Sequence, residues 1–171
     1  MLTATIFNYC ERGRDASFWA EPFNALSNGA FIIAGFAALF LLASPPKPAR
    51  RWPETAFALL MLVIGIGSFL FHTYAEAWAA TADVAPIGLF MVGYLGYALS
   101  RFLRWHPVAV AAALAGFGAA LKYAGDLNCA AGLLPITAAA GRPCFNGSLG
   151  YAPALAAMLL IGAMLLTINH P

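Results

Sequence analysis

The sequence predicts an all-α membrane protein, and three observations carry that prediction. Of the 171 residues, 62% are hydrophobic and 9% are charged, against about 25% charged residues in a typical soluble domain. The mean hydropathy is +0.78. The apolar residues also gather into long runs, and a helix needs about 20 such residues to cross a bilayer. We therefore expect one integral membrane domain over 1–171.

Five segments are long and apolar enough to span the membrane. The tail that precedes them, 1–24, carries acidic and basic residues before any apolar run. It lacks the basic start and short apolar stretch of a cleavable signal peptide. The helices are expected over 25–44, 54–74, 83–100, 107–124 and 150–168.

The placement of Lys and Arg predicts the orientation in the membrane. The connections 45–53 and 101–106 join helix ends on one face and contain Lys47, Arg50, Arg51, Arg101 and Arg104. Short basic loops favour the cytoplasm. We expect the N-terminus outside, in a periplasm or a lumen, and residue 171 on the cytoplasmic side. The net charge of +2 is too small, and too concentrated on these connections, to indicate a nucleic-acid partner.

A polar cluster is predicted where the second and third helices meet. Ser68 and His72 share a helix face at i, i+4, and Asp83 opens the next helix after a short connection. Ionisable residues at membrane depth are costly and usually functional. Imidazole is a common metal ligand, and a carboxylate can orient it or move a proton. The alternative is that these side chains only hydrogen-bond neighbouring helices.

Oxygen donors crowd the N-terminal tail over the run Asn8-Tyr9-Cys10-Glu11-Arg12-Gly13-Arg14-Asp15, and Glu21 follows just before the first helix. Oxygen ligands at irregular spacing suit Ca²⁺. The alternative is an ordinary solvated tail in which Asp15 or Ser17 acts as a helix cap. Asn24 continues the polar face of Glu21 into the first helix, where such a stripe faces protein and supports interhelical hydrogen bonds.

The cysteines Cys10, Cys129 and Cys144 all fall in predicted outer segments, where disulfides can persist. Three is an odd number, so one thiol is free or has its partner outside this chain. A local bridge between Cys129 and Cys144 and a set of unpaired thiols are both compatible with this pattern.

These motifs, in this order, resemble the alkaline ceramidase family, within the larger group of membrane hydrolases that includes the progestin/adipoQ receptors. The matching elements are Tyr9-Cys10-Glu11, the run Phe18-Trp19-Ala20-Glu21-Pro22-Phe23-Asn24-Ala25-Leu26-Ser27-Asn28, Ser68-x-x-x-His72, and Asp83. The resemblance covers essentially all 171 residues, as the first five helices of a seven-helix intramembrane hydrolase bundle.

The resemblance implies a hydrolase of sphingolipid metabolism that uses an intramembrane Zn²⁺. Its substrate would be a ceramide-like lipid amide, and its products a fatty acid and a sphingoid base. By position, His72 would be a zinc ligand. Asp83 would contact the zinc through a water and act as the base. Ser68 would help to stabilise the oxyanion.

The resemblance also implies a Ca²⁺ site in the tail, with Glu11 and Glu21 as the best side-chain matches and Asn8 and Tyr9 as weaker ones. Gly13 stands where the family often offers a further side-chain oxygen. The calcium site is therefore less well matched than the zinc residues.

The sequence departs from the family at its C-terminal end. The family completes its zinc site with His-x-x-x-His at the start of the seventh helix, and this sequence contains no such pair. We expect a C-terminally truncated chain that alone binds zinc weakly and turns over little substrate. A family cysteine near that pair would also be missing, which would leave Cys10 unpaired.

Two other classes of protein remain open. A lipid-sensing receptor of the progestin/adipoQ type would use the same zinc core, but its members tend to have a cytosolic N-terminus, against the loop charges. The other class is a non-catalytic membrane protein whose polar residues only tie helices together.

Overall fold

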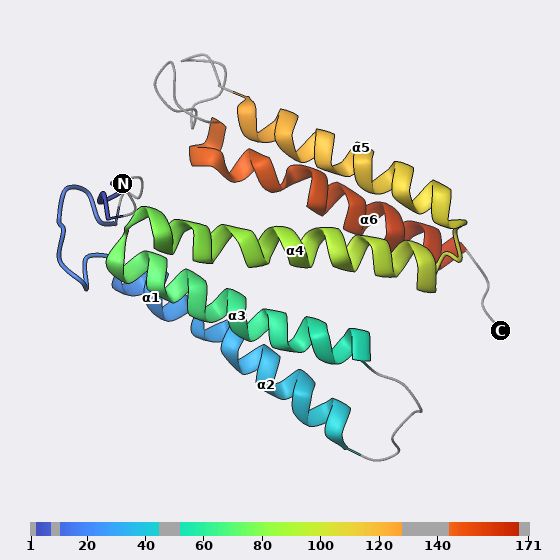
Figure 1. Ribbon diagram of the computed structural model, residues 1–171, viewed down its shortest axis with the longest axis horizontal. Coiled ribbons are helices and arrows are strands. Elements are labelled where there is room, and N and C mark those ends of the chain that lie inside the picture. Colours follow the sequence, from blue (N-terminus) through green and yellow to red (C-terminus); the bar gives the residue numbers. More distant parts are fainter. Residues whose placement is uncertain (1–2, 8–10, 45–51, 128–143, 168–171) are drawn as a thin grey trace. The chain divides into compact units, whose positions relative to one another are not determined.

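The structure is a computed structural model that describes residues 3–7, 11–44, 52–127 and 144–167, the side chains of 144–147 excepted. Within these ranges the chain forms helices and no strand, apart from an isolated β-bridge between Thr5 and Glu76. In chain order the helices are α1 (Pro22–Ser27), α2 (Gly29–Ala43), α3 (Trp52–Tyr74), α4 (Ala77–Arg101), α5 (Pro107–Asp126), the 3-10 helix η1 (Cys144–Tyr151) and α6 (Ala152–Thr167) (Figure 1).

Five helical stretches are long and apolar enough to cross a membrane. They are Pro22–Ala43, Trp52–Tyr74, Ala77–Arg101, Pro107–Asp126 and Ser148–Thr167. This confirms the predicted all-α membrane fold with five spanning helices. The seven-helix bundle stays a prediction.

Local sequence explains where several of these helices begin. Pro22 and Pro107 stand in the first turns of α1 and α5, where the missing N–H breaks no helical hydrogen bond. His106 caps α5, because its side chain accepts a hydrogen bond from the backbone N–H of Val108 at 3.3 Å. A structural role of this kind explains His106 without any metal.

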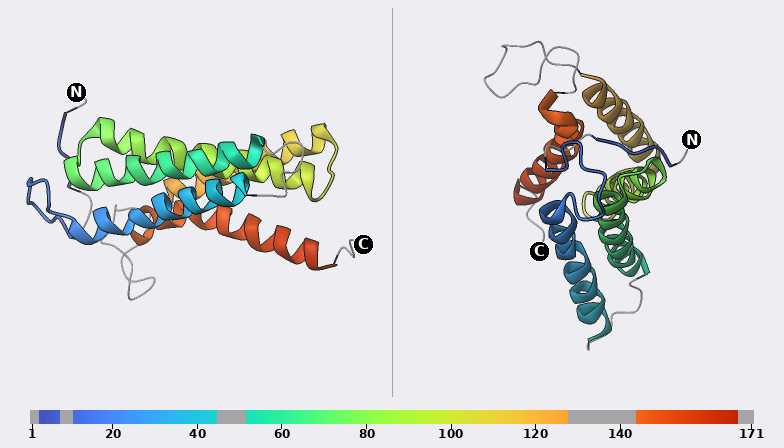
Figure 2. Two further views of the ribbon diagram at one scale, coloured as in Figure 1. Left: turned by 90° about the horizontal axis from the view of Figure 1, so that it is seen from below. Right: turned by 90° about the vertical axis from the view of Figure 1, so that its left-hand side faces the viewer.

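Contacts divide the chain into two units, Met1–Phe90 and Met91–Pro171. In the first unit α2 and α3 run side by side (Figures 1 and 2). Small residues allow this close approach: a Cβ at Gly65 would lie 2.7 Å from Cδ1 of Ile32. Such small residues are typical of helix interfaces in membranes, where packing rather than the hydrophobic effect drives association.

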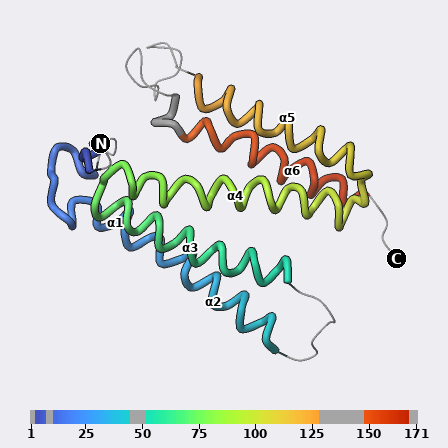
Figure 3. The backbone as a smooth tube through the Cα atoms, viewed as in Figure 1, coloured from blue at the N-terminus to red at the C-terminus, as the bar shows by residue number. Residues whose placement is uncertain are grey.

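In the second unit, the end of α4 packs against α5 and α6. Figure 3 traces α5 and α6 as antiparallel neighbours. The buried centre of this unit consists of Leu95, Leu99, Val110 and Phe117, against which Ala154, Ala157 and Ile161 of α6 pack.

The helix expected over 83–100 begins six residues earlier, at Ala77. Asp83 therefore lies inside α4 instead of opening it. The sequence between Ala77 and Ala82 is mainly alanine, which is the best helix former. This segment is less apolar than the rest of the span, so hydropathy alone placed the start too late.

Candidate functional site

The turn between α3 and α4 brings Ser68 and Asp83 to the same depth. This connection is only two residues long. Ser68 lies six residues before the end of α3 at Tyr74, and Asp83 lies six residues after the start of α4 at Ala77. Equal offsets in an antiparallel helix pair correspond to equal rises along the two axes.

Gly67 lets α3 and α4 approach each other closely at this depth. A Cβ at position 67 would overlap the carbonyl oxygen of Ala82. Pro86 stands four residues after Ala82 and has no N–H to donate to that carbonyl. The residues that follow Gly67 and Ala82 in the two helices are Ser68 and Asp83, which this contact sets side by side.

Ser68, His72 and Asp83 form a buried polar cluster, with relative exposures of 7, 8 and 7%. The hydroxyl of Ser68 donates a hydrogen bond to the Asp83 carboxylate, which is also close enough to His72 for their charges to interact. Among the described residues, no hydrogen-bond partner reaches the buried Oδ1 of Asp83. The structure thus brings the three predicted side chains together, and their chemical roles stay predictions.

Glu21, the residue just before α1, also belongs to this cluster and is 1% exposed. Its Oε2 lies 2.7 Å from Nδ1 of His72 and accepts a hydrogen bond from Nδ2 of Asn24 at 3.2 Å. A carboxylate on one imidazole nitrogen fixes the ring and leaves the other nitrogen as the one to bind a metal. Asn24 thus supports Glu21 from three residues further along the chain, and the interhelical hydrogen bond expected of it stays a prediction.

Arg12 contacts the opposite oxygen of Glu21. Its Nε donates to Oε1 at 2.5 Å, and the Arg12 side chain is 0% exposed. Buried charges need a partner of opposite sign, and each of these two side chains supplies one for the other. Arg12, Glu21 and His72 consequently form a continuous row of contacts into the cluster.

The rest of the tail is organised by hydrogen bonds to backbone. The carboxylate of Glu11 accepts from the N–H groups of Phe23 at 2.7 Å and Asn24 at 3.1 Å, at the start of α1. The carboxylate of Asp15 accepts from the N–H of Ser17 at 2.8 Å and from its hydroxyl at 2.9 Å. These two bonds, the backbone one first, lower the pKa of Asp15 below its ordinary value.

Several predicted residues lie outside what the structure describes. Asn8, Tyr9, Cys10 and Cys129 fall outside the described residues, and Cys144 opens η1 with an undescribed side chain. The calcium site and the disulfide pairing therefore stay predictions.

Sequence reasoning missed Arg12. Its position between Glu11 and Gly13 marks it only as one more charge in a polar tail. A buried role depends on contacts with residues up to 61 positions away, and no local spacing reveals these. The sequence offers one sign of this role, which is that the arginine stands next to several candidate metal ligands.

Two of the described side chains carry donor atoms of the kind that metals bind. No three His, Cys, Asp or Glu side chains within the described ranges come together as a ligand group. His72, oriented through Nδ1, and Oδ1 of Asp83, which has no partner there, are suitable as two donors. A catalytic zinc normally has three protein ligands, so these two side chains would supply only part of such a ligand set.

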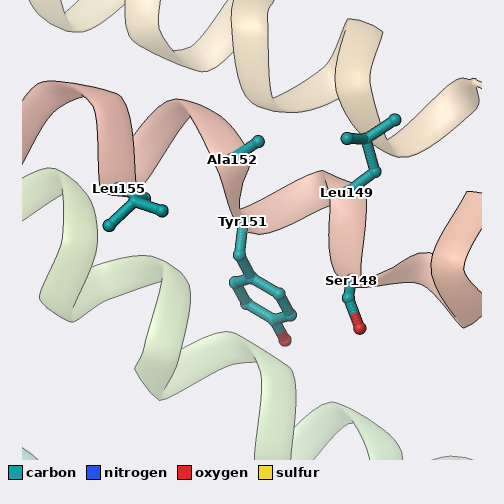
Figure 4. A pocket seen from close by; sticks show the side chains of 5 residues that line it. All are labelled: Ser148, Leu149, Tyr151, Ala152 and Leu155. Atoms are coloured by element: carbon teal, nitrogen blue, oxygen red, sulfur yellow. The ribbon is translucent and has the colours of Figure 1, made fainter.

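The described part of the chain contains hollows that bear on the choice of site. One is an apolar groove along α3 and α4 that includes Gly67 and Ala82 and so adjoins the polar cluster. Another lies at the start of α6, where the hydroxyl groups of Ser148 and Tyr151 point to one side and Leu149 to the other (Figure 4). Its lining contains no carboxylate or histidine, which makes the α3–α4 cluster the stronger candidate.

Five helices long and apolar enough to cross a membrane, with a buried Ser–His–Asp cluster between two of them, define a helical protein of the multi-pass membrane class. The family comparison gives the particular family: residues 2–127 match the Ceramidase family. The chain therefore belongs to the Ceramidase family, and this membership supports a ceramidase-like amide hydrolase with a lipid substrate. The match includes the tail, the cluster and the first four spans. No curated protein and no solved structure matches the chain.

Proposed function

We propose that this protein is a zinc-dependent intramembrane amidase that hydrolyses ceramide-like lipid amides to a fatty acid and a sphingoid base. The observation that supports this most directly is the arrangement around His72. Its Nδ1 contacts the buried Glu21 carboxylate at 2.7 Å, while the Ser68–Asp83 pair lies beside it. An oriented imidazole, a carboxylate and a hydroxyl are the groups that metal-assisted hydrolysis needs.

His72 through Nε2 would hold the zinc, Asp83 would contact it through a water, and ligands beyond the described residues would be needed to complete the site. When bound, zinc polarises the amide carbonyl and lowers the pKa of water towards neutrality. The burial of both side chains strengthens their electrostatic interactions with a cation.

The other steps belong to the chain's own residues. Asp83 takes a proton from the attacking water and delivers it to the leaving amine. Ser68, which donates to Asp83 in the structure, turns its hydrogen bond to the oxygen on which negative charge develops. Glu21 keeps the His72 ring in one orientation throughout.

The test is to replace His72 by Ala in the purified protein, and to measure bound zinc and ceramide hydrolysis. Both are expected to fall to background from the low values that a partial ligand set allows, because the oriented ligand is lost. His106→Ala is the matched control: it removes a histidine that caps a helix and is expected to leave zinc content unchanged.

Zinc content that survived His72→Ala would contradict the ligand assignment. Zinc bound through His72 without hydrolysis of any lipid amide would instead favour a lipid-sensing receptor. A protein that binds no zinc would favour a structural role for the polar cluster.

A further inference from the structure

Arg12 uses every hydrogen-bond donor of its guanidinium inside the protein. Nε donates to Oε1 of Glu21 at 2.5 Å. Nη1 donates to the carbonyl oxygens of Asp15 and Ser17 at 3.2 and 3.1 Å. Nη2 donates to those of His72 and Thr73 at 2.9 and 3.2 Å. A guanidinium has five N–H donors, so all five are matched by oxygen.

These five oxygens come from three parts of the first unit that are separate in sequence. Two belong to the tail after Arg12, one to the residue before α1, and two to the last turn of α3. The carbonyl groups at a helix C-terminus lack helical partners and carry the negative end of the helix dipole. A fixed positive charge is favourable there, and it fastens the tail to α3.

The ligand set around the guanidinium is the kind that a calcium ion prefers. It consists of one carboxylate oxygen and four backbone carbonyl oxygens, whereas Ca²⁺ binds six to eight oxygens, carboxylates and carbonyls among them. Glu21 already contacts Arg12 through one oxygen and His72 through the other. Glu11 uses both of its oxygens at the start of α1. The described carboxylates predicted for calcium are thus committed to other partners.

We propose that the Arg12 guanidinium serves as the internal cation of the tail, in the place that the family resemblance reserves for Ca²⁺. It joins the tail, Glu21 and the end of α3 without a metal ion. Through Glu21 it also acts as a positioning residue for His72, and this second part rests on the proposed function above.

Thermal unfolding of the purified protein in detergent tests the internal cation without any assay of activity. The Tm of the unmodified protein is expected to be the same with EGTA and with millimolar Ca²⁺. Arg12→Ala removes the cation from Oε1 of the buried Glu21 carboxylate and is expected to lower the Tm by about 10 °C. Arg14→Ala, which removes an exposed charge from the same tail, is the control and is expected to leave the Tm unchanged.

Added Ca²⁺ also tests directly whether Arg12 occupies the position that a calcium ion would take. Millimolar Ca²⁺ is expected to raise the Tm of Arg12→Ala, because the same oxygens then become available to the ion. A Tm of the unmodified protein that falls in EGTA, or an Arg12→Ala variant that behaves like Arg14→Ala, would overturn the proposal. A variant that Ca²⁺ does not stabilise would overturn it as well. Should Arg12→Ala fail to fold, Arg12→Lys, which keeps the charge but has fewer donors, is expected to give a smaller drop in Tm.

Zinc affinity tests the positioning role. Glu21→Gln and Arg12→Lys are expected to weaken zinc binding by about 10- to 100-fold, as the loss of an outer-shell partner does. Unchanged zinc affinity in both variants would overturn the positioning role. An unmodified protein that binds no zinc would overturn the proposed function instead, while the Tm experiment would still decide whether Arg12 is the internal cation.

Discussion

At the residue scale, Ser68 makes a contact that links structure to the proposed reaction, since its hydroxyl reaches Asp83 from the neighbouring helix. Ser68→Ala is expected to slow ceramide turnover by about 10²-fold with little change in KM, by analogy with the loss of one oxyanion donor. Steady-state kinetics would measure this. Ser100→Ala, at an exposed serine whose hydroxyl bonds the carbonyl of Gly96, should leave turnover unchanged. Equal turnover in the two variants would remove Ser68 from the mechanism.

The sequence could predict the Ser68–His72–Asp83 cluster because local geometry creates it. One helical turn separates Ser68 from His72, and a short connection returns Asp83 to their level. The contact of Glu21 with His72 joins residues 51 positions apart. It depends on how α1 packs against α3, which no local pattern encodes. The sequence predicts Glu21 only as a calcium ligand or as part of a polar face between helices, and not as the partner of His72.

Asp15 gives a pH-dependent prediction for the tail. Its pKa is lowered from 3.8, first by the backbone N–H of Ser17 and then by the Ser17 hydroxyl. A carboxyl whose pKa falls on folding stabilises the folded state above its unfolded pKa, and this contribution is lost as the pH falls through the folded value. The turn over Asp15–Ser17 is therefore expected to be stable at neutral pH and to weaken in acid.

Ser17→Ala separates the two causes of this lowering. It removes the hydroxyl and keeps the backbone N–H, so the pKa of Asp15 is expected to rise only part of the way towards 3.8. Titration of the carboxyl carbon by NMR would measure it. A pKa that did not move, or that returned fully to the ordinary value, would contradict this order of causes.

At the element scale, the approach of α3 to α4 depends on Gly67. Gly67→Ala would place a Cβ onto the carbonyl of Ala82, and backbone cannot yield as a flexible side chain does. Overpacking of this kind costs about 1–3 kcal/mol, so the Tm is expected to fall by about 5 °C. Gly88→Ala is the matched control, because outside the neighbouring helix backbone no atom of the described residues lies within 4 Å of its added Cβ. A Tm for Gly67→Ala no lower than that of Gly88→Ala would contradict the close approach.

Hydropathy predicted the existence of all five spanning helices, because each apolar run must bury its backbone polar groups in helical hydrogen bonds. It placed the start of α4 less well. The segment Ala77–Ala82 is helical through the propensity of its alanines and the turn at Ala75, whose φ is 50°. The start of α4 depends on the reversal of the chain direction after α3, which a search for long apolar runs does not detect.

At the scale of the whole molecule, the tail and the α3–α4 turn define one end of the first unit. Thr5 forms a β-bridge with Glu76, and Ile6 donates its N–H to the carbonyl of Ala75 at 2.6 Å. Figure 1 shows the tail around this end of α3 and α4. Because α4 is one spanning helix, its two ends face opposite sides of the membrane. The polar cluster is therefore nearest to the membrane face on which the tail lies.

The basic connections predict that this side is the outer one. We expect Ala16→Cys, an exposed position in the tail, to react with a membrane-impermeant maleimide in sealed cells. Phe102→Cys, just beyond the other end of α4, is expected to react only after the membrane is opened. Both variants require a background in which the native cysteines are replaced by serine. The reverse labelling pattern would place the tail in the cytoplasm, contradict the charge-based orientation and favour the topology of the receptor class.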